Sequence, residues 1–235
     1  MKYVYTDMVK ITIVGDQNTG KSFFCKKLLN SDYFETIYSP TLGVDFFLYR
    51  YKTKSNTQNK NIQVNLWDLS GNPKFFCILN NYLKQSNFFL LFCDVTNIQS
   101  VKSLQNWIEK IRKENTYHQQ NFISIICTKN DKPKTTDTIN NLTINEYIQN
   151  FTEQFHNDNF INGTIYYIEK NTDRKKIIKN IISEYFKFNT HFPKSFNSIY
   201  DTEISTNKNC WIKFTECIKN IFKRNKKYNQ ETLLN

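Results

Sequence analysis

An eight-residue segment near the start of the chain has the residue types and spacing of a phosphate-binding loop. Residues 15–22, GDQNTGKS, match the pattern G-x-x-x-x-G-K-[ST] and stand between an apolar run, residues 9–14, and a helical pattern. Glycines let backbone N–H groups turn toward a phosphate, Lys21 can neutralise β- and γ-phosphate oxygens, and the Ser22 hydroxyl can bind magnesium at a helix N-terminus. Such a match arises by chance in on the order of one per cent of chains this long, so the segment predicts a nucleotide site. The other residues expected to line the nucleotide here are Gln17, Asn18, Thr19, Gly20 and Phe23.

A second polar segment, residues 128–131, follows another apolar run, residues 122–127, and consists of Thr-Lys-Asn-Asp. A carboxylate at its last position, Asp131, can accept hydrogen bonds from the N1–H and the exocyclic amine of guanine, a donor pattern that adenine lacks. Taken alone, the segment could equally be a solvated loop. Beside a phosphate-binding loop, it predicts that Asp131 selects guanine and that Thr128 and Lys129 belong to the same site.

Three segments between these two resemble motifs of the Rab-type small GTPases of the Ras superfamily. Residues 40–46, PTLGVDF, are similar to the Rab effector segment S-T-I-G-V-D-F, and residues 67–72, WDLSGN, are similar to W-D-T-A-G-Q. Residues 94–96, DVT, strengthen the match after their own apolar run. The Thr-Lys-Asn-Asp segment then resembles the guanine motif N-K-x-D, with Thr128 in place of Asn as in some Rho-branch members, a departure that can weaken nucleotide affinity.

The resemblance, which covers about residues 8–187, implies a magnesium-dependent switch between GTP and GDP. In the family, the threonine equivalent to Thr41 binds magnesium and the γ-phosphate only in the GTP state. The aspartate equivalent to Asp68 holds magnesium through water, and the N–H of the glycine equivalent to Gly71 contacts the γ-phosphate. Loss of the γ-phosphate releases both loops, which are switches I and II. The expected partners are effector, exchange-factor and GTPase-activating proteins, and the expected process, by analogy with Rabs, is vesicle trafficking.

The resemblance also implies which residues contact the base. Tyr33 is placed to stack on the guanine face, and Phe34 is an equal candidate. Residues 168–170, Ile-Glu-Lys, take the place of the family's S-A-K. Because the middle residue of that motif acts through its backbone N–H, Glu169 can still serve, and the stem of Lys170 can cover the base.

Asn72 occupies the place of the family glutamine that orients the attacking water. Its side chain is one methylene shorter, so we predict slow intrinsic hydrolysis, because a displaced water loses the near-attack geometry. Residues 72–76, NPKFF, are similar to the G-H-P-F-F stretch of the J-domain-associated Rab-like class, whose members also lack the glutamine. The alternative function is a nucleotide-bound interaction scaffold that hydrolyses little or nothing. A working switch is favoured by four intact residues, Lys21, Ser22, Thr41 and Asp68. Two of them, Lys21 and Thr41, are also catalytic candidates beside Asn72.

Short apolar runs alternate with helical patterns up to about residue 188, which predicts an α/β domain with a mostly parallel sheet of six strands and helices on both faces. Residues 44–51 and 61–67 flank a polar stretch, residues 52–60, that is more easily a hairpin than a crossover, so one antiparallel edge strand is expected. The other strands are expected at 9–14, 88–93, 122–127 and 165–168, and the helices at 21–29, 73–84, 100–113, 144–155 and 173–186.

Composition limits the class of protein further. The 235 residues, 39% of them hydrophobic, can bury one sizeable core. Phe46 and Trp67 belong to the family-like segments, and the alternative is that they are ordinary core aromatics, or both. No apolar stretch approaches the ~18 residues needed to span a bilayer and no signal-peptide pattern begins the chain, so we expect an intracellular, cytoplasmic protein. The six cysteines lack paired metal-ligand spacing, which favours reduced and mostly buried thiols.

Residues 189–235 are expected to form an extension outside the domain of residues 1–188. Its residues 209–224 have the spacing of a basic amphipathic helix, and the chain ends without the terminal cysteine that prenylation requires. Three alternatives remain open for this extension: peripheral contact with an anionic membrane, helped by acylation of Cys210 or Cys217, packing against protein, or a solvated tail. Nucleic-acid binding is not expected, because no reader motif accompanies the net charge of +11.

Overall fold

The structure of the chain is a computed structural model, and the residues it describes are 6–34, 37–54, 59–84, 86–115, 122–133, 138–139, 141–157 and 163–190. The chain divides into two units, Met1–Lys187 and Phe188–Asn235. The second unit lies outside the described residues apart from the last turn of a helix. The predicted amphipathic helix, with Cys210 and Cys217, is therefore not among the described residues, and its role stays a prediction.

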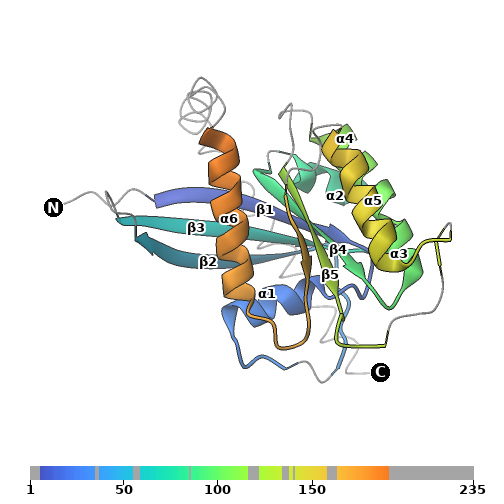
Figure 1. Ribbon diagram of the computed structural model, residues 1–235. Coiled ribbons are helices and arrows are strands. Elements are labelled where there is room, and N and C mark those ends of the chain that lie inside the picture. Colours follow the sequence, from blue (N-terminus) through green and yellow to red (C-terminus); the bar gives the residue numbers. More distant parts are fainter. Residues whose placement is uncertain are drawn as a thin grey trace, which may run out of the picture. The chain divides into compact units, whose positions relative to one another are not determined.

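A six-stranded sheet forms the centre of the first unit (Figure 1). The strand order is β2-β3-β1-β4-β5-β6, in which every neighbouring pair is parallel except β2 and β3. This arrangement confirms the predicted mostly parallel sheet with one antiparallel edge strand. The strands are β1 (Thr6–Gly15), β2 (Val44–Lys54), β3 (Asn59–Leu69), β4 (Phe88–Asp94), β5 (Phe122–Thr128) and β6 (Ile165–Tyr167).

The β2–β3 hairpin is longer than the hydrophobic pattern predicts. Its ladder runs from the pair Val44 and Leu69 to the pair Lys54 and Asn59, whereas the polar stretch 52–60 was expected to form the turn. Polar residues can continue an antiparallel ladder at the edge of a sheet because one of its faces meets water. The central strands β4 and β5, by contrast, are buried along their whole length, as their continuous apolar runs predict.

Helices cover both faces of the sheet. In Figure 1, α1 and α6 lie on one face, while α2, α3, α4 and α5 lie on the other. The helices are α1 (Lys21–Leu29), α2 (Phe76–Leu83), α3 (Ile98–Lys102), α4 (Leu104–Glu114), α5 (Ile144–Asn157) and α6 (Arg174–Thr190), with a 3-10 turn, η1, at Pro73–Phe75. Two predicted helices are thus divided: the second begins as the 3-10 turn, and the third is interrupted at Ser103, whose hydroxyl donates to the Gln99 carbonyl at 2.9 Å.

The core alternative holds for Trp67 and not for Phe46. Trp67 is 7% exposed, but Phe46 is 46% exposed. Phe46 lies on the edge strand, where its ring contacts Trp67 on only one side, with the ring centroids 4.9 Å apart. Three of the four described cysteines are buried and all four are free thiols, as predicted; Cys77 on α2 is the exposed one.

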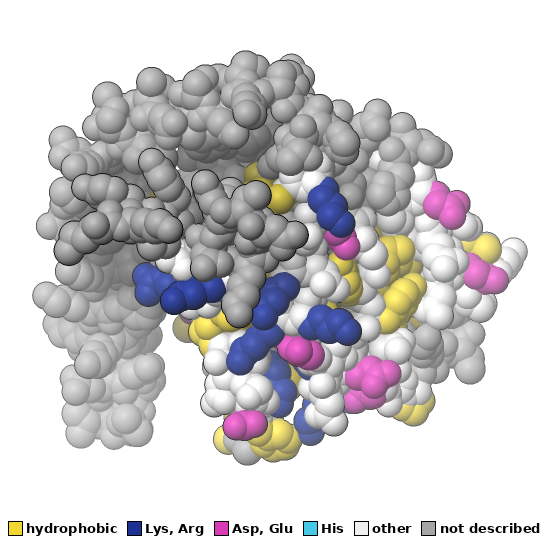
Figure 2. Space-filling view, turned by 60° about the vertical axis from the view of Figure 1, so that its left-hand side comes forward, with side chains coloured by type: hydrophobic (Ala, Val, Ile, Leu, Met, Phe, Trp, Pro, Cys, Tyr) yellow, Lys and Arg dark blue, Asp and Glu magenta, His cyan; other side chains and the backbone are white. Residues whose placement is uncertain are grey.

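The surface carries many basic side chains. Figure 2 shows Lys and Arg gathered over part of one face, with Asp and Glu side chains between them. On α6 the exposed lysines include Lys175, Lys176 and Lys179. Within the described part of the chain, no helix combines the length and the apolar character that crossing a membrane requires.

Candidate nucleotide-binding site

The loop between β1 and α1 has positive φ angles at three positions, which are occupied by glycine or asparagine. Gly15 and Gly20 have φ angles of 140° and 85°, and Asn18 has a φ of 60°, a left-handed value that Asn tolerates better than most residues. A Cβ on Gly15 would also lie 2.4 Å from the carbonyl oxygen of Phe92 on β4. The loop is therefore shaped by close packing of β1 against its neighbour, at the end of the strand where α1 begins.

Lys21 lies at the first residue of α1 and is only 5% exposed. Its ammonium donates to the carbonyl oxygens of Gly15 at 2.8 Å and Asp16 at 2.6 Å, so the side chain folds back over the loop. Burial lowers its pKa to about 8, although the carboxylates of Asp68 and Asp16 favour the charged form. The ammonium is thus a buried positive charge inside the loop that the sequence assigns to phosphate.

Three residues predicted to bind magnesium meet beside this loop, although they are far apart in the sequence. The Ser22 hydroxyl donates to Asp68 Oδ2 at 2.6 Å and lies 2.8 Å from Thr41 Oγ1. Thr41 Oγ1 also donates to Asp68 Oδ2 at 3.4 Å. Asp68 is fully buried at the end of β3, and its Oδ1 has no hydrogen-bond partner among the described residues.

This cluster has the chemistry of a site for a hard divalent cation. It presents two hydroxyl oxygens and a carboxylate oxygen with free lone pairs, which are the donors that Mg²⁺ prefers. Burial raises the pKa of Asp68 to about 6, while the hydrogen bond from Ser22 and the charge of Lys21 oppose this rise. A bound cation would stabilise the charged form of this carboxylate, and Asp68 Oδ1 has no other partner among the described residues, so Ser22, Thr41 and Asp68 fit the metal that the sequence predicts.

Gly71 packs against the phosphate-binding loop. A Cβ at this position would lie 2.3 Å from both the carbonyl carbon of Asp16 and the backbone nitrogen of Gln17. Only a glycine can come this close, so the segment after β3 contacts the loop directly, as the predicted contact of the Gly71 N–H with a γ-phosphate requires. Switch I is joined to the same segment, because the Ser70 N–H donates to the Gly43 carbonyl at 2.8 Å.

Asn72 has a structural partner in this conformation. Its Oδ1 accepts a hydrogen bond from the Lys74 N–H at 3.0 Å, so it caps the 3-10 turn that starts at Pro73. The side chain is therefore held toward its own backbone. This contact is an N-cap of the kind that Asn favours, and the sequence signal for it is the proline directly after the asparagine.

Thr128 connects the base side of the site to the phosphate side. Thr128 is 5% exposed, and its hydroxyl lies 2.9 Å from the carbonyl oxygen of Thr19 and 3.1 Å from that of Cys93. The next residue, Lys129, has a φ of 59° and its ammonium lies 2.5 Å from Asp94 Oδ2, the first residue of the DVT segment. Thr128, which stands where the family has Asn, is thus hydrogen-bonded to the phosphate-binding loop.

Substitution of Thr128 by Val, which removes the hydroxyl and keeps the shape, should speed the release of bound nucleotide about tenfold. The reason is that the Thr19 carbonyl loses a buried partner, at a cost of ~1 to 2 kcal/mol. Thr128→Ser, which retains the hydroxyl, serves as the control and should release nucleotide at nearly the wild-type rate. Release of a fluorescent nucleotide measures this effect, and an unchanged rate in Thr128→Val would refute the role of the hydroxyl.

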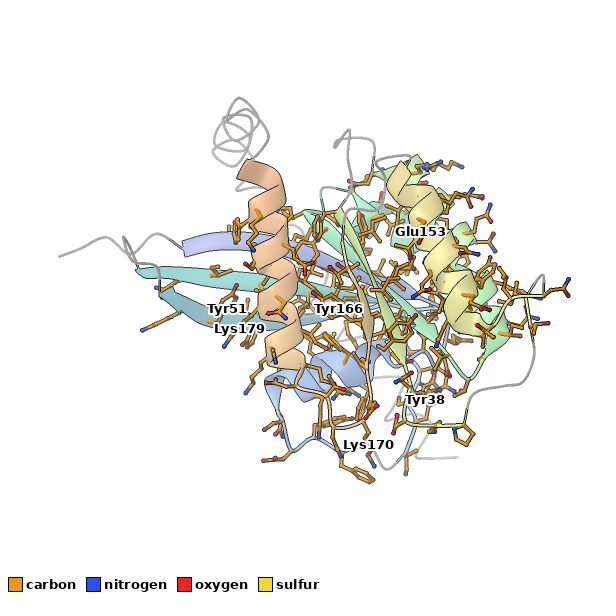
Figure 3. The ribbon with its side chains drawn as sticks, in the orientation of Figure 1. Tyr38, Tyr51, Glu153, Tyr166, Lys170 and Lys179 are labelled. Carbon is orange, nitrogen blue, oxygen red and sulfur yellow. The ribbon has the colours of Figure 1, made fainter. Side chains whose placement is uncertain are left out.

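The remaining base-contact candidates lie on adjoining loops. The Asn130 N–H donates to the Ile168 carbonyl at 3.2 Å, which joins the loop of Asp131 to that of Glu169 and Lys170. Figure 3 shows Lys170 and Tyr38 at the same end of the molecule. Asp131 is exposed and could face a ligand.

The structure separates the two aromatic candidates. Phe34 is 60% exposed, and the Lys170 ammonium lies 4.4 Å from the centre of its ring. Tyr33 instead contacts the ring of Phe23, with centroids 6.0 Å apart, and the ammonium of Lys26. Phe34 is thus the aromatic residue that the structure brings next to a residue predicted to cover the base.

The backbone N–H of Glu169, predicted to contact the base, already has a hydrogen-bond partner in the structure. It donates to the Thr172 hydroxyl at 2.8 Å. Thr172 would have to rotate before that N–H could bind a ligand. The sequence signal that reveals this competition is a threonine three residues after the glutamate, a spacing that allows a local side-chain-to-backbone hydrogen bond.

Sequence reasoning missed a group of residues that joins the phosphate-binding loop to the start of α2. The Trp107 indole N–H on α4 donates to Asp16 Oδ1 at 2.8 Å, and the Trp107 ring meets Phe76 edge to face at 5.3 Å. The Lys110 ammonium lies 3.0 Å from the centre of the Phe76 ring. The group comes from three separate segments of the chain. From the sequence, the helical spacing around Trp107 predicts only that this side of the helix faces the core, and it does not reveal the contacts with Asp16 and Phe76.

The fold and these loops define a P-loop domain that binds nucleotide at the ends of its parallel strands. Comparison with known proteins gives the family: residues 10–131 match the family described as Roc, Ras of Complex, Roc, domain of DAPkinase. Since this match spans more than half of the chain, the protein belongs to the Ras superfamily of small GTPases and is Rab-like. Membership supports guanine-nucleotide binding and GTP hydrolysis in general.

Several curated relatives carry Rab names. Ras-related protein RabL of Dictyostelium discoideum is 29% identical over 147 residues, which are 63% of this chain and 69% of that protein. Ras-related protein RabN1 of the same organism is 25% identical over an alignment that covers 92% of this chain and 100% of the relative. GTP-binding protein ypt4 of Schizosaccharomyces pombe is 32% identical, and the aligned segment covers 47% of each chain.

Proposed function

We propose that this protein is a magnesium-dependent GTP/GDP switch with slow intrinsic hydrolysis, which acts in vesicle trafficking through effector proteins. The observation that carries the proposal is the meeting of Ser22, Thr41 and Asp68 beside the phosphate-binding loop. A switch needs a residue of switch I that reaches both the metal and the phosphates, and the Thr41 hydroxyl lies against the other two. When bound, Mg²⁺ would neutralise phosphate charge at this cluster.

Exposed apolar side chains near the switches support a role in binding effectors. Leu42, Phe46 and Ile78 are 69%, 46% and 47% exposed, and they lie in or next to the segments whose conformation depends on the nucleotide in the family. Large apolar groups left exposed in this way are typical of protein-interaction surfaces.

The proposed role in trafficking is supported by the Rab names of the relatives. Contact of the C-terminal extension with an anionic membrane is likewise a proposal.

Slow hydrolysis is supported by the position of Asn72. Its amide oxygen accepts the Lys74 N–H, so the side chain would have to give up this cap before it could orient a water. Its shorter length adds to the same effect, because the family glutamine reaches one methylene farther. An external arginine finger contributes about 10³- to 10⁵-fold in related enzymes, so the intrinsic rate is measured on the isolated protein.

Asn72→Gln should therefore speed single-turnover GTP hydrolysis by roughly tenfold or more, because the longer amide can reach the attacking water. Asn72→Ser is the matched control: it can still cap the 3-10 turn but carries no amide, so its rate should equal that of the wild type. A wild-type rate as fast as that of typical Rab proteins would disprove slow hydrolysis, and an unchanged rate in Asn72→Gln would show that geometry at this residue is not its cause.

A non-hydrolysing scaffold is the second candidate, and the same Asn72 contact favours it. Intact Lys21, Ser22, Thr41 and Asp68 favour the switch, since a scaffold has less need of residues that sense the γ-phosphate. The two differ in one outcome. A slow switch converts its bound GTP to GDP at a rate that Asn72→Gln raises, whereas a scaffold leaves its bound GTP intact in the wild type and in Asn72→Gln alike, in the presence of Mg²⁺.

A further inference from the structure

Arg174, at the first residue of α6, is an unusual buried cation. Its side chain is 3% exposed, and its guanidinium donates hydrogen bonds to backbone carbonyls. One nitrogen, Nη2, donates to the Glu169 carbonyl at 2.7 Å. The other, Nη1, donates to the Lys170 carbonyl at 2.9 Å and to the Thr172 carbonyl. The guanidinium is planar and rigid and carries several N–H donors, so this one group can bind three carbonyl oxygens of the same loop.

The loop held in this way connects β6 to α6 and contains two of the base-contact candidates. Inside it, the Thr172 N–H donates to the Glu169 carbonyl at 3.2 Å, so the guanidinium and the backbone share that oxygen. Lys170 projects from the same loop to the ring of Phe34. The position of Lys170 and of the Glu169 backbone therefore depends on Arg174.

Arg174 also lies near the other segments at the base side. Burial lowers the pKa of its guanidinium, and the charges of Asp131 and Asp173 act against this decrease. The guanidinium carbon lies 5.8 Å from the centre of the Phe23 ring, on the first turn of α1 directly after Ser22. One buried side chain thus contacts the loop of Glu169 and lies beside the helix that follows the phosphate-binding loop, and the charge of the predicted guanine selector acts on it.

We propose that Arg174 is the positioning residue of the guanine-binding end, where it fixes the loop of Glu169 and Lys170 and sets the lifetime of the bound nucleotide. The inference rests on the proposed guanine-nucleotide site and deepens it. Arg174 acts through the loop: the hydrogen bonds of its guanidinium go to the carbonyls of that loop, and not to the described side chains of Ser22, Thr41 and Asp68. Its loss should therefore weaken contacts to the base and leave the chemistry at the γ-phosphate unchanged.

The test uses the full chain in four forms: wild type, Arg174→Met, Arg174→Lys and the control Lys176→Met, which removes an exposed charge from the same helix. GDP release is measured with a fluorescent analogue, the affinities for GDP and ADP by competition, and hydrolysis by single turnover at saturating GTP. ADP shares the diphosphate and the ribose but lacks the donors of guanine, so the ratio of the two affinities reports on the contacts that are specific to guanine.

We expect Arg174→Met to release GDP roughly ten- to a hundredfold faster, because charge-assisted hydrogen bonds to the loop are lost. The preference for GDP over ADP should fall by a similar factor, while the rate constant for hydrolysis of bound GTP stays within about twofold of the wild type. Arg174→Lys, which retains the charge without the fork, should be intermediate and also serves if the Met variant does not fold. Lys176→Met should match the wild type.

Two results would overturn the inference while leaving the proposed function in place. One is release of GDP at the wild-type rate by both Arg174 variants. The other is an equal loss of affinity for GDP and ADP, which would mean that the domain is loosened in general. If the wild type itself binds no guanine nucleotide, the proposed function fails first and this inference with it.

Discussion

Lys21→Met should lower the affinity for GDP and GTP by roughly 10²- to 10³-fold. The ammonium is buried within the phosphate-binding loop and is held by the Gly15 and Asp16 carbonyls, so it is already placed to meet a phosphate. Removing one partner of a buried charge pair costs ~3 to 5 kcal/mol, which corresponds to a loss of this size. Methionine fills nearly the same volume, so the fold should be retained. Equilibrium titration with a fluorescent nucleotide measures the loss.

The control for this experiment is Lys113→Met, which removes an exposed lysine from α4. Its affinity should equal that of the wild type, because a solvated charge that is distant from a ligand is screened by salt. If Lys21→Met keeps an affinity within threefold of the wild type and folds normally, the loop does not bind phosphate through this residue.

Asp131→Asn should reverse the base preference of the site. Two hydrogen bonds from guanine to a carboxylate are lost or become repulsive, and each is worth ~1.5 to 3 kcal/mol, so the affinity for GDP should fall roughly 10²- to 10⁴-fold. Xanthine has an oxygen where guanine has its amine, and an asparagine amide can donate to it. The affinity for the xanthine nucleotide should therefore rise in the variant. Competition between the two diphosphates measures both changes.

Glu153→Gln provides the matched control, because it neutralises an exposed carboxylate on α5, which Figure 3 shows away from Lys170. That variant should retain the wild-type preference for guanine. A preference for GDP in Asp131→Asn as strong as that of the wild type would contradict the assignment of Asp131 as the selector.

Most of the sheet could be predicted from the sequence, because its signals are local. Buried parallel strands appear as continuous apolar runs, and the strand β4 (Phe88–Asp94) was expected to within one residue of its end. The extent of the β2–β3 hairpin was not predicted, since pairing across the edge depends on partners and not on hydrophobicity. The exposure of Phe46 was not predicted for a related reason: its apolar character does not reveal that the edge strand leaves it half in water.

The site was predictable where a motif fixes the backbone, and it was missed where a contact is made by side chains outside the motif. The spacing of residues 15–22 predicts a loop of the observed form, with Asn18 in the left-handed region. The contacts of Asn72 with Lys74 and of Glu169 with Thr172 depend on local side-chain competition that a family motif does not encode. Arg174 could not be identified at all, because a lone arginine at the start of an amphipathic helix is usually a solvated charge.

Whether this chain holds a guanine nucleotide is measured most directly by chromatography of the nucleotide released from the purified, denatured protein. We predict close to one equivalent of GDP, or of GDP with some GTP, and no adenine nucleotide. Release of GTP alone would keep the guanine site and favour the scaffold over the switch. Release of an adenine nucleotide, or of none even after incubation with GDP and Mg²⁺, would show that the protein is not a guanine-nucleotide switch.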